Sequence, residues 1–137
     1  MKVQITINKT IGDIKKEFTA AWPHLMLGFY SKPHTENHGS NAKFMVTDDH
    51  LTVSQLGSGY QENSELTLEA DMPVREVERL LEEKFGLHTQ IFRHSGSVWL
   101  QTTVSDKLTL DQQEERGIAS DYVPVVENEP FDYREMD

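Results

Sequence analysis

Histidines and carboxylates gather in one stretch of the sequence, residues 32–50. His34 and His38 stand four residues apart, and Asp48 lies close to His50. Imidazole and carboxylate groups together can bind zinc or another divalent ion. A His-x-x-x-His pair holds a metal best on a helix, but the proline, asparagine and glycine of this stretch disfavour a helix. Two interpretations therefore stay open: a metal site at His34, His38, Asp48 and His50, or a solvated polar loop.

No catalytic constellation can be recognised elsewhere in the chain. Ser31 and Ser40 lie near these histidines, but the sequence has no Gly-x-Ser-x-Gly elbow and nothing that would activate either serine. The absence of cysteine excludes a thiol nucleophile, a cysteine zinc site and a disulfide framework. With 23 acidic residues, a pair of carboxylates carries no information about glycosidase chemistry. A non-catalytic protein without a cofactor is favoured over an enzyme.

Trp99 is a candidate for binding another protein. It alternates with Val98 and Leu100 in a predicted strand, so it faces outward if those two residues face the core. An exposed tryptophan beside threonines and glutamines is typical of a binding hot spot. The alternative is that a helix or the C-terminal residues cover its ring.

The C-terminal residues 118–137 form a second candidate surface. They are acidic, contain two prolines and have no helical periodicity, so we expect a disordered tail. Aromatic and apolar side chains are unusual in a solvated tail and could anchor a partner; they are Tyr122, Phe131, Tyr133 and Met136. Residues 123–126 could instead add to a sheet edge, in this chain or in a second copy. An inert, solubilising tail is the third interpretation.

Residues 64–113 must form the framework that positions these groups. The alternation of residues 65–69 predicts a strand, and the amphipathic run 74–85, ended by Gly86, predicts a helix. Strands at 89–93 and 98–104 follow, joined by a turn at His94-Ser95-Gly96-Ser97. This order is a βαββ unit.

The first half of the chain has the same order of elements. We expect a strand at 3–7, a helix capped by Thr10 and ended by Pro23, strands at 25–30 and 43–47, and a closing turn at 49–53. The apolar positions of the two helices match at a constant offset of 63 residues; they are Ile11, Ile14, Phe18 and Trp22 against Val74, Val77, Leu81 and Phe85. The pattern predicts a tandem repeat.

These elements predict an α+β fold. Two βαββ repeats, 1–56 and 64–113, would build a single domain of residues 1–117, with the tail at 118–137. We expect two helices packed on one face of a sheet, as in a ferredoxin-like fold, because each helix has one apolar stripe. Duplicated ubiquitin-like β-grasp halves are the alternative. A short helix at 111–116 would end at Gly117.

Several motifs of the chain resemble a family of small bacterial proteins of unknown function. They are Phe85-Gly86, Ser95-Gly96, Trp99-Leu-x-Thr-Thr103 and Thr109-Leu-x-x-Gln113, together with 29–34 and 39–45 in the front half. The similarity covers most of residues 1–113 and is lost in the tail. It implies the fold, and it implies no catalytic residue.

The charge of the chain is concentrated at its C-terminal end. Of the net charge of −10, residues 106–137 carry −7. Because nucleic-acid binders need cationic patches, we expect no nucleic-acid partner. The chain has neither a signal-peptide pattern nor an apolar run that could span a bilayer, so we expect a cytoplasmic protein without a membrane partner.

The leading hypothesis is a non-catalytic protein-binding module, an adaptor or inhibitor. It would use an aromatic strand face around Trp99 together with the acidic tail. The alternative is a metal-dependent or small-molecule-binding protein that uses the loop 32–50. Homo-oligomerisation through an exposed sheet edge is a third hypothesis.

Overall fold

The computed structural model describes residues 2–33 and 42–122. Their strands are β1 (Lys2–Thr6), β2 (Leu25–Tyr30), β3 (Glu65–Glu69), β4 (His88–Ser95) and β5 (Val98–Gln101). Their helices are α1 (Ile11–Ala21), α2 (Val53–Leu56), α3 (Val74–Phe85) and α4 (Leu110–Tyr122), with a 3₁₀ turn η1 (Ala42–Phe44). None of these helices is long and apolar enough to cross a membrane.

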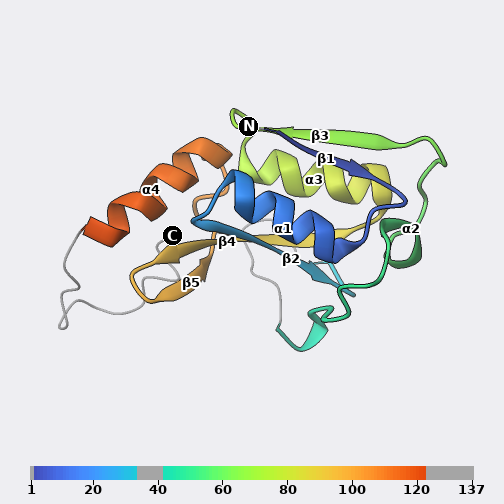
Figure 1. Ribbon diagram of the computed structural model, residues 1–137, viewed down its shortest axis with the longest axis horizontal. Coiled ribbons are helices and arrows are strands. Elements are labelled where there is room, and N and C mark those ends of the chain that lie inside the picture. Colours follow the sequence, from blue (N-terminus) through green and yellow to red (C-terminus); the bar gives the residue numbers. More distant parts are fainter. Residues whose placement is uncertain (1, 34–41, 123–137) are drawn as a thin grey trace.

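The strands form two antiparallel sheets. β1 pairs with β3, and the second sheet has the order β2-β4-β5. In the view of Figure 1, the β1–β3 pair lies above α1 and α3, and β2 and β4 lie below them. The predicted α+β class is confirmed, and the arrangement is compatible with a ferredoxin-like fold. In place of the single predicted sheet, the strands form two separate sheets. Each long helix contacts one strand of either sheet: α1 contacts β1 and β2, and α3 contacts β3 and β4.

One hydrophobic core joins these elements. Each long helix buries a single apolar stripe at helical spacing, as predicted, and β1 and β3 each bury alternate residues. Trp22, which was expected in the core, is 1% exposed, and its ring lies 5.2 Å from that of Phe18, measured between ring centroids. Two local predictions are confirmed: Thr10 caps the start of α1, and Gly86 ends α3.

The two halves make matching backbone hydrogen bonds where their closing turns meet their long helices. The four bonds are Ile11 N–H to Leu51 O (2.8 Å), Gly12 N–H to Asp49 O (3.0 Å), Val74 N–H to Leu108 O (2.9 Å) and Arg75 N–H to Asp106 O (2.8 Å). They satisfy N–H groups of the first helical turn, which have no partner within the helix. The tandem repeat stays a prediction, and these bonds support it.

Three expected elements differ in the structure. Instead of a strand at 43–47, the chain forms η1 and a single β-bridge from Met45 to Tyr30. β5 ends at Gln101 rather than at residue 104. The expected end of the last helix at Gly117 is wrong, because α4 runs through this residue to Tyr122. The rest of the predicted tail, 123–137, lies outside the described residues.

Gly86 joins the two halves through a close backbone approach. It ends α3 with φ of +67°, and a Cβ atom at this position would lie 2.2 Å from the carbonyl oxygen of Ser58. Gly59 has nearly the same φ, +68°, but no atom lies within 4 Å of its Cβ position. An alanine at Gly59 would therefore show the cost of the left-handed backbone alone, whereas an alanine at Gly86 would add the cost of a steric clash.

We expect Gly59→Ala to lower the free energy of unfolding by about 1 kcal/mol, the cost of a left-handed alanine. Gly86→Ala should cost at least ~2 kcal/mol more, because the added methyl group overlaps the backbone of Ser58. Urea denaturation of both variants measures the difference. Equal losses in the two variants would contradict the close approach.

Candidate functional site

Trp99 faces outward on β5, but only one of the two neighbours expected in the core is buried, because Val98 at the start of the strand is 50% exposed. The other neighbour, Leu100, is 3% exposed, whereas Trp99 is 40% exposed. Across the β4–β5 ladder Trp99 pairs with His94, and the two rings meet edge to face with centroids 5.0 Å apart. The histidine thus fixes one side of the indole and leaves the other to solvent.

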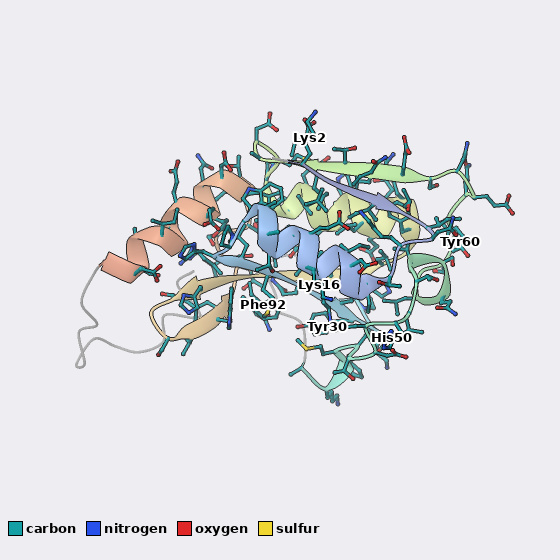
Figure 2. The ribbon with its side chains drawn as sticks, viewed as in Figure 1. Lys2, Lys16, Tyr30, His50, Tyr60 and Phe92 are labelled. Carbon is teal, nitrogen blue, oxygen red and sulfur yellow. The ribbon has the colours of Figure 1, made fainter. Side chains whose placement is uncertain are left out.

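Other apolar side chains share this face of the β2–β4–β5 sheet. Phe92, which is only 7% exposed, and its partly buried cross-strand partner Met26 lie on it, because directly paired residues point to the same side. Met45, 37% exposed, approaches the sheet above Gly28. Figure 2 shows Phe92 on the side of the strands away from α1. We call this surface, made of Met26, Met45, Phe92, His94 and Trp99, the outer face.

Tyr30 lies at the other end of the same sheet and is almost completely buried. Burial raises the pKa of its phenol to about 12. Its hydroxyl therefore stays protonated at any physiological pH, and it offers no acid–base group to the outer face.

Helix α4 packs beside the outer face through a polar contact with His24, the residue before β2. The backbone N–H of His24 donates to Glu114 Oε1 at 2.8 Å. Its ring Nδ1 lies 2.7 Å from Glu114 Oε2, and its ring Nε2 lies 2.7 Å from Asp121 Oδ2. One histidine therefore touches carboxylates from both halves of α4.

Further side-chain contacts hold α4 on the molecule. The indole Nε1 of Trp22 donates to Asp111 at 3.2 Å, and Arg93 donates to Gln113 at 2.9 Å. Near the end of the helix, the hydroxyl oxygen of Ser120 lies 2.7 Å from the carbonyl oxygen of Gly117 and 3.2 Å from that of His94. Arg93 and Gln113 are buried, so the helix is fixed by matched polar groups as well as by the buried Leu110.

The carboxylates around His24 change its proton affinity. The hydrogen bond to Asp121 raises the pKa of His24 above its ordinary value of 6.5; the contact with Glu114 adds to this, and partial burial opposes it. Because the folded pKa is raised, the stabilisation is complete below pH 6.5 and is lost as the pH rises through the folded value.

A small pocket of about 260 Å³ lies at a separate place, between α3 and β4. Arg75 and Asp106 form its most buried ion pair, with Nη2 and Oδ1 3.0 Å apart. His88 Nδ1 lies 3.2 Å from Glu82 Oε1, and Pro33 closes the rim. The volume is slightly below the usual range for ligand pockets.

Exposed charges on α3 surround this pocket. Arg79 contacts both Glu76 and Glu83 along the helix. Its hydrogen bond lowers the pKa of Glu76, and the same bond raises the pKa of Arg79. The pocket wall is therefore lined by paired charges of both signs.

The structure describes only two of the four predicted metal ligands. Asp48 and His50 are exposed, and Asp48 Oδ1 accepts the backbone N–H of His50 at 3.0 Å, which makes a local turn. His34 and His38 lie outside the described residues. Within 2–33 and 42–122, no three histidine or carboxylate side chains are placed to hold a metal ion.

The other predicted binding residues are described only in part. Tyr122 is the last residue of α4, and its side chain is outside the described part of the structure. Phe131, Tyr133 and Met136 lie beyond it as well. Trp99 is therefore the one predicted partner-binding residue whose surroundings the described residues define.

His24, Glu114 and Asp121 were not identified from the sequence. His24 is 90 residues before Glu114 and 97 residues before Asp121, so no local spacing in the sequence brings it to either carboxylate. The sequence contained one usable signal: Glu114 and Asp121 are seven residues apart, which places them on one face of a helix that continues through Gly117. The expectation that Gly117 ends the helix concealed it.

No protein family, curated protein or solved structure was found to match the chain. The resemblance to a family of small bacterial proteins therefore stays a prediction.

Gly117 allows α4 to approach the sheet closely. A Cβ atom at this position would lie 2.5 Å from Cβ of His24. Replacing a glycine inside a helix by alanine ordinarily stabilises it by about 0.5–1 kcal/mol. We expect the opposite here: Gly117→Ala should lower the free energy of unfolding by about 1–3 kcal/mol, because it separates α4 from His24.

Urea denaturation and hydrogen exchange of the α4 amides measure this effect. Ile118→Ala is the matched control, since its side chain is exposed on the same helix and should change stability by less than ~0.5 kcal/mol. A Gly117→Ala protein that is more stable than the wild type would show that α4 does not pack against His24.

Proposed function

We propose that this chain is a non-catalytic protein-binding module, an adaptor or inhibitor, that contacts its partner through the outer face. The observation that carries the proposal is Trp99, a large aromatic side chain 40% exposed and braced by His94. A tryptophan already fixed by a neighbouring ring loses little conformational freedom on binding, and such residues dominate interface energetics.

The end of α4, which precedes the acidic C-terminal residues in the sequence, lies in the same region. Ser120, two residues before the end of α4, accepts the backbone N–H of Gly96 in the β4–β5 turn at 3.4 Å. The 15 residues that follow Tyr122 can span at most about 50 Å. Phe131, Tyr133 and Met136 are therefore within reach of a partner bound at Trp99, and the acidic charge would favour a partner with a basic surface.

Photo-crosslinking in the native host tests this proposal. We expect a crosslinker placed at Trp99 to capture a defined protein, and one placed at the exposed His50 to capture none. His50 is a suitable control because it lies at the opposite end of the molecule from α4 (Figure 2). Equal capture from both positions would contradict a specific outer-face contact.

The captured protein then allows a quantitative prediction. Trp99→Ala should weaken its binding by roughly 30-fold, the effect of removing a hot-spot tryptophan. Val104→Ala removes a comparably exposed apolar side chain and should change the Kd by less than about threefold. A chain that ends after Tyr122 shows whether the tail contributes. An unchanged Kd for Trp99→Ala would refute the proposed function.

A second candidate function is small-molecule binding in the pocket between α3 and β4. It is favoured by the ion pair of Arg75 and Asp106 at the pocket wall and by Pro33, which lines the pocket and belongs to the histidine-rich stretch 32–50. The metal-dependent form of this function stays a proposal, because His34 and His38 lie outside the described residues.

Ligand screening by thermal denaturation tests this candidate. We expect a ligand of the pocket to raise the Tm of the wild type and of His50→Gln, but to have a smaller effect on His88→Gln, because His88 lines the pocket. Elemental analysis of the purified protein tests the metal form: stoichiometric zinc that disappears when His34 and His38 become alanine would establish it. Without any ligand-dependent shift or bound metal, the candidate fails.

A further inference from the structure

The contact between α4 and the sheet depends on one imidazole between two carboxylates. Nδ1 of His24 faces Glu114, and Nε2 faces Asp121, each at 2.7 Å. A neutral imidazole carries one N–H and one lone pair, so it can donate to only one of these carboxylates. The imidazolium form has two N–H donors and can donate to both at once.

We propose that His24 is a proton-dependent clamp, which holds the C-terminal half of α4 on the sheet and thereby controls the outer face at Trp99. When His24 loses its proton, one ring nitrogen presents a lone pair to a carboxylate, and that bond is replaced by repulsion. The consequence for partner binding rests on the function proposed above, whereas the clamp itself does not.

The charged groups around His24 come from the two elements packed against it. α4 contributes Glu114 and Asp121. β4 contributes His94, whose Nδ1 lies 3.8 Å from Asp121 Oδ1, and Arg93, whose stem approaches Gly117. Both carboxylates contact His24 at 2.7 Å, so a proton on His24 can take part in two charge-assisted hydrogen bonds.

Asp121 and Ser120 connect the clamp to Trp99. Asp121 lies between the two histidines, whose ring centroids are 6.3 Å apart. The Ser120 hydroxyl, whose nearer acceptor is the carbonyl oxygen of Gly117 at 2.7 Å, also lies 3.2 Å from the carbonyl oxygen of His94, and the ring of His94 contacts the indole of Trp99. If the last turn of α4 is released, His94 therefore loses its contacts with Asp121 and Ser120, and His94 is the residue that packs against Trp99.

The clamp belongs to a part of α4 that the first half of the chain lacks. The closing turns of the two halves match at an offset of 57 residues, as Leu51 and Leu108 show. At this offset Leu56, the last residue of α2, corresponds to Gln113 in α4. Glu114, Gly117, Ser120 and Asp121 all follow Gln113. The extension is therefore not needed to close the unit, which is consistent with a helix that can be released while the core stays folded.

Proton NMR of the full chain between pH 5 and 9 tests the proposal without a partner. We expect the C2–H signal of His24 to titrate above 6.5. Across that transition, hydrogen exchange of the amides 117–122, corrected for intrinsic rates, should accelerate roughly three- to tenfold, the factor for losing one charge-assisted bond at a partly exposed site. The indole N–H signal of Trp99, assigned with Trp99→Phe, should shift with the His24 midpoint.

Two variants separate the clamp from a general effect of pH. His24→Gln should remove the pH dependence of both signals, whereas His50→Gln, an exposed histidine far from α4, should preserve it. The proposal is overturned if His24 titrates at or below 6.5, if α4 exchange is independent of pH, or if the Trp99 signal does not shift with the His24 midpoint. If the clamp behaves as expected while Trp99→Ala leaves partner binding unchanged, the clamp stands and the proposed function fails.

Discussion

The first-turn amides of the two long helices constrain the whole molecule. Buried N–H groups at a helix start need acceptors, and the closing turns provide them: Ile11 bonds to Leu51, and Val74 bonds to Leu108. These bonds fix where each closing turn lies and therefore where the helix after it begins. In the first half that helix is the single turn of α2. In the second half it is α4, which starts at the core with Leu110 and then runs along β4.

Because its start is fixed, α4 must cover the end of the β2–β4–β5 sheet, and it does so with polar groups. Gln113 meets Arg93 inside the protein, and His24 meets Glu114 and Asp121 closer to solvent. A polar interface of this kind depends on every donor having an acceptor, so its stability responds to protonation more than an apolar interface does. The last turn of the same helix lies near Trp99. The protonation-dependent contact between His24 and Asp121 is therefore close to the most exposed aromatic residue of the outer face.

Local signals in the sequence were sufficient for much of the fold. The stripe of α3 and the Gly86 stop predicted that helix from Val74 to Phe85, and strand alternation predicted that Trp99 faces outward. These features depend on residues within four positions of one another. Glycine was ambiguous, because the same residue type ends a helix at Gly86 and allows a close approach at Gly117. Only the packing of His24, about 90 residues away, decides between the two roles.

A double-mutant cycle between His24 and Asp121 tests the clamp most directly. The free energies of unfolding of the wild type, His24→Ala, Asp121→Ala and the double variant should give a favourable coupling of roughly 0.5–1 kcal/mol at pH 6. At pH 9 we expect the coupling to be weaker, because an imidazole that has lost its proton can donate to only one of the two carboxylates. Additive effects of the two substitutions at pH 6 would contradict the clamp, and so would a coupling that stays the same at both pH values.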